Sequence, residues 1–342
     1  MSRQTALVVC PGRGTYNKEE LGYLARHHGG RADLIAPFDA ARADLGQETL
    51  SALDGAERFS LATHSRGDNA SALIYACALA DYQAIDRERY EVVAVTGNSM
   101  GWYVALACGG TLDAMGGFRV VNGMGSLMQE ALIGGQLLYP FVDEDWRAVP
   151  GKRDALLALT DEIANLYISI HLGGMVVFAG DAAALYAAEA RLEPLEGRFP
   201  MRLANHAAFH SPLQAPVAAR GRERLAPDLF AGPALPLIDG RGHLWMPQAS
   251  DPVALWDYTL GHQVVEAYDF TAAIRNGLRE FAPDCVIVLG PGATLGGAIA
   301  QVLIAENWQG LSAKADFTAR QAEDPFILTM GLAEQGALVR NA

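Results

Sequence analysis

The sequence predicts an α/β fold with a mostly parallel sheet, because three short apolar segments each run into a glycine-containing turn. The segments are Ala6–Cys10, Val92–Thr96 and Cys285–Leu289, and the turns that follow them are 11–14, 97–101 and 290–292. Apolar runs of this length, separated by helix-compatible sequence, are typical of strands that helices bury on both faces. Because functional loops gather at the carboxyl ends of such strands, we expect the three turns to line one crevice.

A different pattern, from about residue 135 to residue 205, predicts a small inserted subdomain. The expected elements are a strand at 136–142, a helix at 152–165, strands at 166–171 and 175–179, a helix at 182–195 and a strand at 198–203. This β-α-β-β-α-β order is the ferredoxin-like pattern. We therefore expect a core formed by residues 1–134 and 206–342, with a ferredoxin-like insert at 135–205.

Two further segments are predicted to be helical. The segment Leu112–Ala131 contains four glycines, each of which costs a helix about 0.8–1 kcal/mol relative to alanine. Either a close backbone approach or a break near Gly123 would account for them. The tail after Ala315 is charged, and we expect it to pack as a helix on the outside.

Composition excludes several classes of protein. The 342 residues carry a net charge of -13, which disfavours nucleic-acid binding, and no run of about 18 apolar residues predicts a membrane span. The N-terminal apolar run is too short for a signal peptide, so we expect a cytoplasmic protein. None of the four cysteines forms a C-x-x-C pair or has histidines at metal-ligand spacing, which predicts reduced core thiols and no metal site.

The strongest local motif is the G-x-S-x-G formed by residues 97–101, with Ser99 at its centre. It follows an apolar strand and precedes the helix-compatible run Trp102–Cys108, which is the context of a nucleophile elbow. The helix N-terminus behind such a turn offers free N–H groups to a developing oxyanion. A degenerate copy at residues 63–67 lacks the first glycine and the strand, and we interpret it as a loop.

A nucleophilic serine needs a base, and His210 is the candidate. A lone histidine is more often structural than catalytic, so the assignment depends on its neighbours. Five segments, in order along the chain, resemble motifs of the malonyl-CoA:acyl-carrier-protein transacylases, the acyltransferases of fatty acid and polyketide synthesis. They are Pro11–Gly14, Gly97–Trp102, Leu127–Ala131, Ala207–Leu213 and Leu289–Gly292.

The resemblance implies an α/β-hydrolase-like core and a ping-pong mechanism. Ser99 would attack an acyl-CoA thioester, His210 would take its proton, and an acyl-carrier-protein thiol would then attack the acyl-serine. The backbone N–H groups of Met100 and Arg13 would form the oxyanion hole, and the carbonyl of Gln263 would orient the histidine. The resemblance implies no permanently bound cofactor, with acyl-CoA and the carrier protein as the binding partners.

Three departures from the family pattern concern the substrate. The family's carboxylate-binding Arg is replaced by Met124, its His before the nucleophile by Asn98, and its Glu after the elbow by Trp102. We expect these residues, with Phe209 beside the base, to contact the substrate. Losing a bidentate guanidinium contact costs roughly 1.5–3 kcal/mol, which favours an acyl unit other than malonyl. Alternatively, the Arg13 side chain could replace the missing cation.

Other interpretations remain open from the sequence. The same serine and histidine could clear acyl groups from carrier proteins by hydrolysis, or the chain could be a catalytically weak homologue that only binds a partner. The basic cluster of Arg220, Arg222 and Arg224 would suit acidic CoA or an acidic carrier protein, although it also fits an ordinary solvated helix face.

Overall fold

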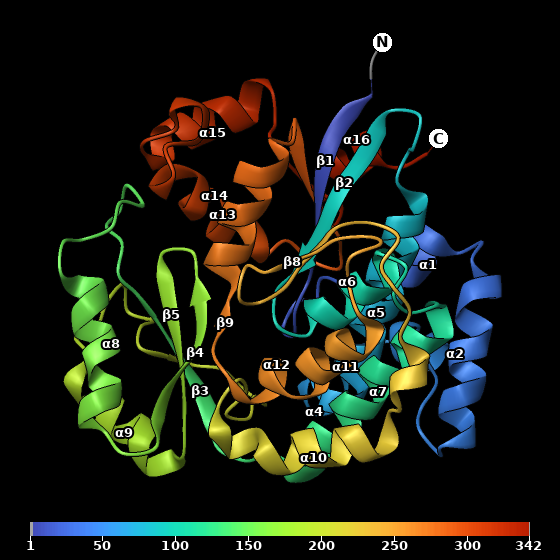
Figure 1. Ribbon diagram of the computed structural model, residues 1–342, viewed down its shortest axis with the longest axis horizontal. Coiled ribbons are helices and arrows are strands. Elements are labelled where there is room, and N and C mark those ends of the chain that lie inside the picture. Colours follow the sequence, from blue (N-terminus) through green and yellow to red (C-terminus); the bar gives the residue numbers. More distant parts are fainter. Residues whose placement is uncertain (1–2, 342) are drawn as a thin grey trace.

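The computed structural model describes residues 3–341, which form two sheets flanked by helices (Figure 1). The six-stranded sheet has the order β11-β10-β1-β2-β7-β8 and is parallel except for the β7–β8 pair. Its strands are β1 (Gln4–Cys10), β2 (Tyr90–Gly97), β7 (Leu237–Ile238), β8 (Leu244–Trp245), β10 (Cys285–Val288) and β11 (Ile327–Thr329). The three strands expected from the sequence are therefore neighbours at its centre, and their carboxyl ends share one edge.

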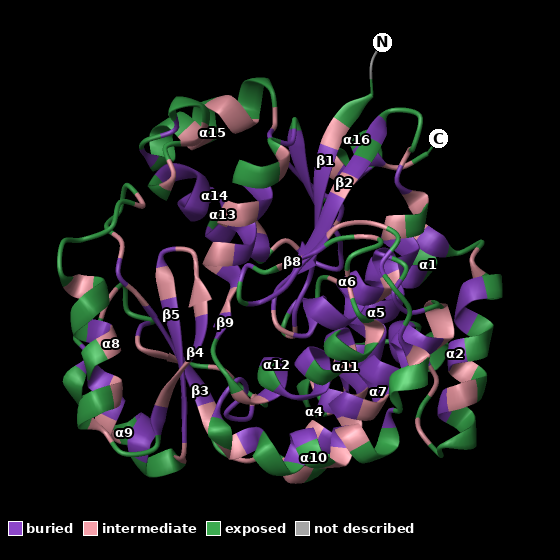
Figure 2. Cartoon of the chain, in the orientation of Figure 1, coloured by how far each residue is buried: buried purple, intermediate pink, exposed green. Residues whose placement is uncertain are grey.

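Helices cover the six-stranded sheet, whose central strands are buried (Figure 2). The longer ones are α2 (Ala32–Asp44), α5 (Gly67–Ala84), α6 (Gly101–Cys108), α7 (Ala114–Ala131), α10 (Ala215–Arg224), α11 (Pro252–Leu260), α13 (Phe270–Phe281), α14 (Leu295–Ala305) and α15 (Lys314–Glu323). The shorter ones are α1 (Tyr23–His28), α3 (Leu50–Asp54), α4 (Leu61–His64), α12 (His262–Val265) and α16 (Ala333–Val339). Helix α6 follows β2 directly, as the elbow motif predicts.

A second, five-stranded sheet lies beside the first and has the order β6-β3-β5-β4-β9. Its strands are β3 (Gly135–Pro140), β4 (Leu166–Leu172), β5 (Met175–Gly180), β6 (Met201–Arg202) and β9 (Tyr268–Asp269), and its helices are α8 (Lys152–Glu162) and α9 (Ala182–Arg191). Strand β9 comes from the C-terminal half and pairs in parallel with β4. This pairing, which the sequence did not predict, ties the second sheet to the segment that leads into α13.

Helix α7 is continuous, so its glycines do not break it. A Cβ atom on Gly125 would lie 2.6 Å from the carbonyl oxygen of Gly67 and 2.9 Å from Ser71 Oγ. Helices α5 and α7 therefore pack with their backbones in contact, which only a glycine permits. Of the two explanations that the sequence left open, close backbone approach holds at this position.

Two local predictions were wrong in part. Residues 63–67 are not simply a loop, because α4 ends at His64 and α5 begins at Gly67. In the tail, α15 lies outside with no buried residue, as expected, but β11 is a buried strand of the large sheet. Arg340 then folds back to bind the buried carboxylate of Asp81 at 2.9 Å.

The four cysteines are free and buried. Over residues 3–341, no helix is long and apolar enough to cross a membrane, and no cluster of three or more potential metal ligands is found.

Candidate active site

Ser99 occupies the sharp turn between β2 and α6. Its φ is 56°, a left-handed conformation that is costly for a residue with a side chain and that characterises nucleophile elbows. A Cβ atom on Gly97 would lie 2.3 Å from the carbonyl oxygen of Gly101, so the first glycine of the motif lets the turn close. The turn lifts the Ser99 hydroxyl out of the sheet at its carboxyl edge.

The Ser99 hydroxyl meets the imidazole of His210. Ser99 Oγ lies 2.7 Å from His210 Nε2, and His210 Nδ1 lies 2.6 Å from the backbone carbonyl oxygen of Gln263. A carbonyl only accepts, so Nδ1 carries the proton and Nε2 is free to accept one from the serine. Burial lowers the pKa of His210 to about 4, although its bond to the Gln263 carbonyl opposes that shift. The imidazole is therefore neutral at pH 7, as a general base must be.

A buried polar chain holds the segment that carries His210. Ser169 Oγ donates to the Phe209 carbonyl at 2.7 Å, and Gln136 Nε2 donates to Ser169 Oγ at 2.6 Å. The Gln136 side-chain oxygen lies 2.7 Å from Nδ1 of His206. The chain runs from β3 and β4 to the residue before the base, so the second sheet helps to position it. No local sequence pattern marks these residues, because their contacts join segments far apart in the chain.

Gln263 also reaches Ser99 through its side chain. Its Nε2 donates to the Ser99 carbonyl at 3.1 Å, and its Oε1 accepts from the Tyr103 hydroxyl at 2.9 Å. Tyr268 donates to the Gly97 carbonyl at 2.6 Å on the other side of the turn. One residue of α12 thus contacts both the serine and the histidine, and the strained turn is fixed at both ends.

The expected oxyanion donors are available. Among the described residues, the backbone N–H groups of Met100 and Arg13 donate to no protein acceptor. The loop after β1 packs against the elbow, since a Cβ atom on Gly12 would lie 2.6 Å from the Asn98 carbonyl oxygen. This close approach brings the loop that carries Arg13 against the turn that carries Ser99 and Met100.

Two cavities meet at Ser99. An inner pocket of about 20 Å³ extends toward α7, and a cleft of about 570 Å³ runs between the N-terminal loop and the second sheet. Among residues 3–341, only Ser99, Arg13 and Phe209 line both. Of the other residues expected at the substrate, Met124 lines the inner pocket and Asn98 lines the cleft. The cleft therefore gives access to Ser99 from one side, and the inner pocket on the other side has room for only about one or two water molecules.

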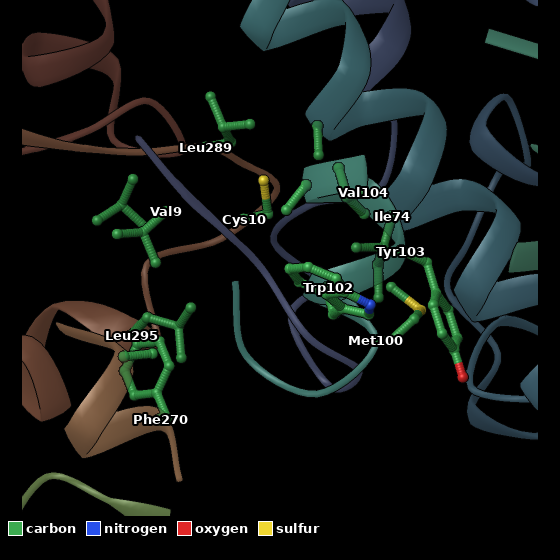
Figure 3. Close-up of a cluster of buried hydrophobic side chains, with 14 of the residues drawn as sticks. Val9, Cys10, Ile74, Met100, Trp102, Tyr103, Val104, Phe270, Leu289 and Leu295 are labelled. Atoms are coloured by element: carbon green, nitrogen blue, oxygen red, sulfur yellow. The ribbon is translucent and has the colours of Figure 1, made fainter. Parts of the chain in front are cut away.

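Trp102, also expected at the substrate, lines neither cavity. It is completely buried, donates to Thr259 Oγ1 at 2.9 Å, and lies in the hydrophobic cluster around Cys10 and Val104 (Figure 3). Trp102 is the second residue of helix α6, and its side chain turns toward the core rather than toward the pocket. Its expected substrate contact is wrong for this reason.

Two members of the basic cluster on α10 are already engaged in ion pairs. Arg220 pairs with Glu130, and Arg222 pairs with Asp257 at 2.7 Å. Both pairs are on the surface, where such contacts contribute little and exchange readily with other anions.

Comparison with known proteins supports the resemblance that the motifs suggested. No family model matches the chain. The malonyl-CoA:acyl-carrier-protein transacylase of Escherichia coli K12 is 28% identical over 150 residues, which are 42% of this chain and 46% of that protein. The chain thus spans about half the length of the curated relatives it matches.

Solved structures match over nearly the whole chain. A malonyl-CoA:acyl-carrier-protein transacylase from Synechocystis has a TM-score of 0.73 at 17% identity, over 98% of this chain and all of that one. A malonyl transacylase of type II polyketide synthesis, solved with its acyl carrier protein, has a TM-score of 0.68 at 20% identity, over 88% and 93%. The fold is therefore the mixed α/β fold of the malonyl transacylases, and the resemblance to that family is confirmed.

Proposed function

We propose that the chain is an acyltransferase that moves an acyl group from CoA to the phosphopantetheine thiol of an acyl carrier protein. The observation that carries the proposal is the relay from Ser99 Oγ through His210 to the Gln263 carbonyl, with contacts of 2.7 and 2.6 Å. The names of the relatives support it, since they are transacylases that act on CoA and carrier-protein substrates.

The relay would act twice in each cycle. Ser99 Oγ attacks the thioester carbonyl while its proton passes to His210 Nε2, and the CoA thiolate leaves and takes that proton. The carrier-protein thiol then gives its proton to Nε2 as its sulfur attacks the acyl-serine, and Ser99 recovers the proton as it leaves. In both steps the N–H groups of Met100 and Arg13 would stabilise the oxyanion.

The partners follow from the two cavities. The cleft of about 570 Å³ would admit a phosphopantetheine arm, and the acyl group would lie beside Ser99, where the cleft meets the small inner pocket. The position from which the family holds a malonyl carboxylate carries Met124, which is buried. The apolar side chain at position 124, taken alone, favours an acyl group without a carboxylate. An acyl group with a carboxylate would need the positive charge of Arg13, which lines the same pocket.

We also infer that the chain divides into an α/β-hydrolase-like core, 1–134 and 206–342, and a ferredoxin-like insert, 135–205. The parallel order around β1 and the elbow after β2 support the first part. The ferredoxin-like insert is supported by its strand order, β6-β3-β5-β4, and by its two helices. Helix α8 follows β3 in the chain, and helix α9 follows β5.

The test is acyl transfer to a defined serine. Incubation with an acyl-CoA should add one acyl group at Ser99, located by mass spectrometry after proteolysis. Ser99→Ala should abolish the adduct, whereas Ser250→Ala, at a serine that lines neither cavity, should leave it unchanged. Full labelling of the Ser99→Ala protein would contradict the mechanism.

The same acyl-enzyme distinguishes transfer from hydrolysis. When a phosphopantetheine thiol is added, a transferase passes the acyl group to that thiol faster than to water. Loss of the adduct at the same rate with and without the thiol would instead identify an acyl hydrolase.

A further inference from the structure

Arg13 occupies the junction of the two cavities. It lies in the loop after β1, and with Ser99 and Phe209 it lines both the inner pocket and the cleft. Its guanidinium carbon lies 5.2 Å from the centre of the Phe209 ring, beside the base. A long cationic side chain therefore stands next to the serine that would carry the acyl group.

The guanidinium of Arg13 has no anionic partner. One of its terminal nitrogens donates to the backbone carbonyls of Ser65 at 3.2 Å and Asn205 at 3.0 Å. Over the described residues 3–341, no carboxylate lies within 4.0 Å of it; Asp68, whose charge acts on it, is paired with Arg66 at 3.1 Å. Burial lowers the pKa of Arg13 to about 10, so the group stays charged at neutral pH.

An arginine has five N–H donors, and the two carbonyl contacts use only one of its nitrogens. Arg13 is half-buried, and a partly desolvated cation without an anion is stabilised by a forked, bidentate contact with a carboxylate. The side chain that carries these open donors belongs to a residue that lines both cavities beside Ser99. The missing anion is therefore expected to come with the substrate.

Helix α7 cannot supply the cation. The Met124 side chain is fully buried and directed at α10, where a Cβ atom on Gly221 would lie 2.7 Å from its sulfur. Val121 and Met128, one turn to either side, make the pocket lining apolar. Arg13 is the one arginine or lysine among the described residues that line this pocket, so it is the group that would meet a negative charge on a short acyl group.

We propose that Arg13 is the specificity-determining residue of this site and that it selects an acyl group with a free terminal carboxylate. The inference rests on the proposed acyl transfer to Ser99. In this proposal the cation that recognises the substrate lies in the loop after β1 and not in α7. An anionic acyl group could then be bound although position 124 carries a methionine.

The test compares malonyl-CoA with acetyl-CoA, which share every phosphate and differ only in the terminal carboxylate. A role of Arg13 in binding the CoA phosphates would change both rates equally and leave their ratio constant. In single-turnover acylation of Ser99, the wild type should favour malonyl. Arg13→Gln should lower the malonyl-to-acetyl ratio about tenfold or more, the loss expected for one charge-assisted contact. Arg13→Lys should keep part of the preference, since the charge remains but the forked geometry does not.

Two results would overturn the inference. One is a wild type that acylates as fast with acetyl-CoA as with malonyl-CoA, which would establish a neutral pocket. The other is a malonyl preference that survives Arg13→Gln, which would assign the selection to another cation of the cleft, such as Arg198. Circular dichroism of the variants would confirm folding, and the ratio of rates within one variant cancels any general damage.

A binding measurement separates this inference from the proposed function. In a Ser99→Ala background, calorimetry should give malonyl-CoA tighter binding than acetyl-CoA, and adding Arg13→Gln should remove the difference. If no acyl-enzyme forms in the wild type but this difference is found, the proposed transfer fails and the anion site stands. Equal binding of malonyl-CoA and acetyl-CoA to the Ser99→Ala protein would contradict the proposal that Arg13 binds the terminal carboxylate.

Discussion

Ser99 and His210 share a left-handed backbone, with φ of 56° and 55°, and their side chains meet at 2.7 Å. Neither is a glycine, so both positions carry a conformational cost that the surrounding contacts must offset. The Gln263 amide on the Ser99 carbonyl and the Ser169 hydroxyl on the Phe209 carbonyl are the contacts that hold them. The elbow and the base segment are thus strained elements fixed by neighbouring side chains, as is common at active sites.

This strain predicts the order of stability of two inactive variants. Left-handed φ costs alanine roughly 1–2 kcal/mol, whereas glycine adopts it freely and loses about 0.4–1 kcal/mol through its more flexible unfolded chain. Ser99→Gly should therefore be more stable than Ser99→Ala by up to about 1 kcal/mol. Urea unfolding of both proteins measures the difference. An alanine variant that is as stable as the glycine variant would show that the turn relaxes.

The pH dependence of acylation follows from the pKa of His210, which burial lowers to about 4. The base works only when neutral, so kcat/KM should fall as the pH drops through about 4 and stay level from about 5 to neutral pH. A histidine with an ordinary pKa of about 6.5 would instead lose activity near pH 6. A pH profile of Ser99 acylation by an acetyl-pantetheine thioester between pH 3.5 and 8 distinguishes the two. This donor has no titrating group in that range, whereas the phosphate monoester of acetyl-CoA has a second pKa of about 6.

The Gln263→Ala variant separates what the Gln263 backbone carbonyl contributes to acylation from what its side-chain amide contributes. Its carbonyl holds His210 and persists in Gln263→Ala, but that variant loses the amide bonds to the Ser99 carbonyl and the Tyr103 hydroxyl. At about 1 kcal/mol per bond, we expect the rate of acylation to fall roughly 5- to 30-fold, far less than in His210→Ala. Tyr103→Phe, which removes one of these bonds, should fall between the wild type and Gln263→Ala. A loss in Gln263→Ala as large as that of His210→Ala would mean that the amide, not the carbonyl, is essential.

Local patterns predicted the elements that form from local sequence. The apolar segments that became β1, β2 and β10 are recognisable because burial on both faces requires continuous apolar composition. The turn at Ser99 is recognisable because its glycines meet a local steric need. The short strands β7, β8 and β9 carry no such signal, since two residues pair only because the fold brings a partner strand beside them.

The residues of the candidate site also fall into two groups: those that local sequence predicts and those that only the packed fold brings together. Ser99 and His210 lie in motifs that sequence reveals, but the chain Gln136–Ser169–Phe209 forms only when two sheets pack together. Trp102 was misplaced because its position beside the nucleophile says nothing about which way the first turn of α6 faces. The sequence left open whether the acyl pocket is neutral or has Arg13 as its cation. Among the described residues the Arg13 guanidinium has no carboxylate partner, and this observation supports the proposed clamp.

The glycines of α7 give a final prediction, with two positions on one helix expected to respond in opposite directions. At Gly123, an added Cβ would meet nothing closer than a Leu225 methyl at 3.8 Å, so Gly123→Ala should gain helix propensity and stabilise the protein by up to about 1 kcal/mol. At Gly125, the same atom would lie 2.6 Å from the Gly67 carbonyl oxygen, which is backbone of α5 and cannot rotate away. Forcing α5 and α7 apart should cost about 1–3 kcal/mol, more than the propensity gain, so Gly125→Ala should be destabilised. Because Gly125 also lines the inner pocket, the displaced helices should slow Ser99 acylation as well. Urea unfolding of the two variants tests the contrast, and equal stabilities would mean that the close approach of these helices is not what requires a glycine at position 125.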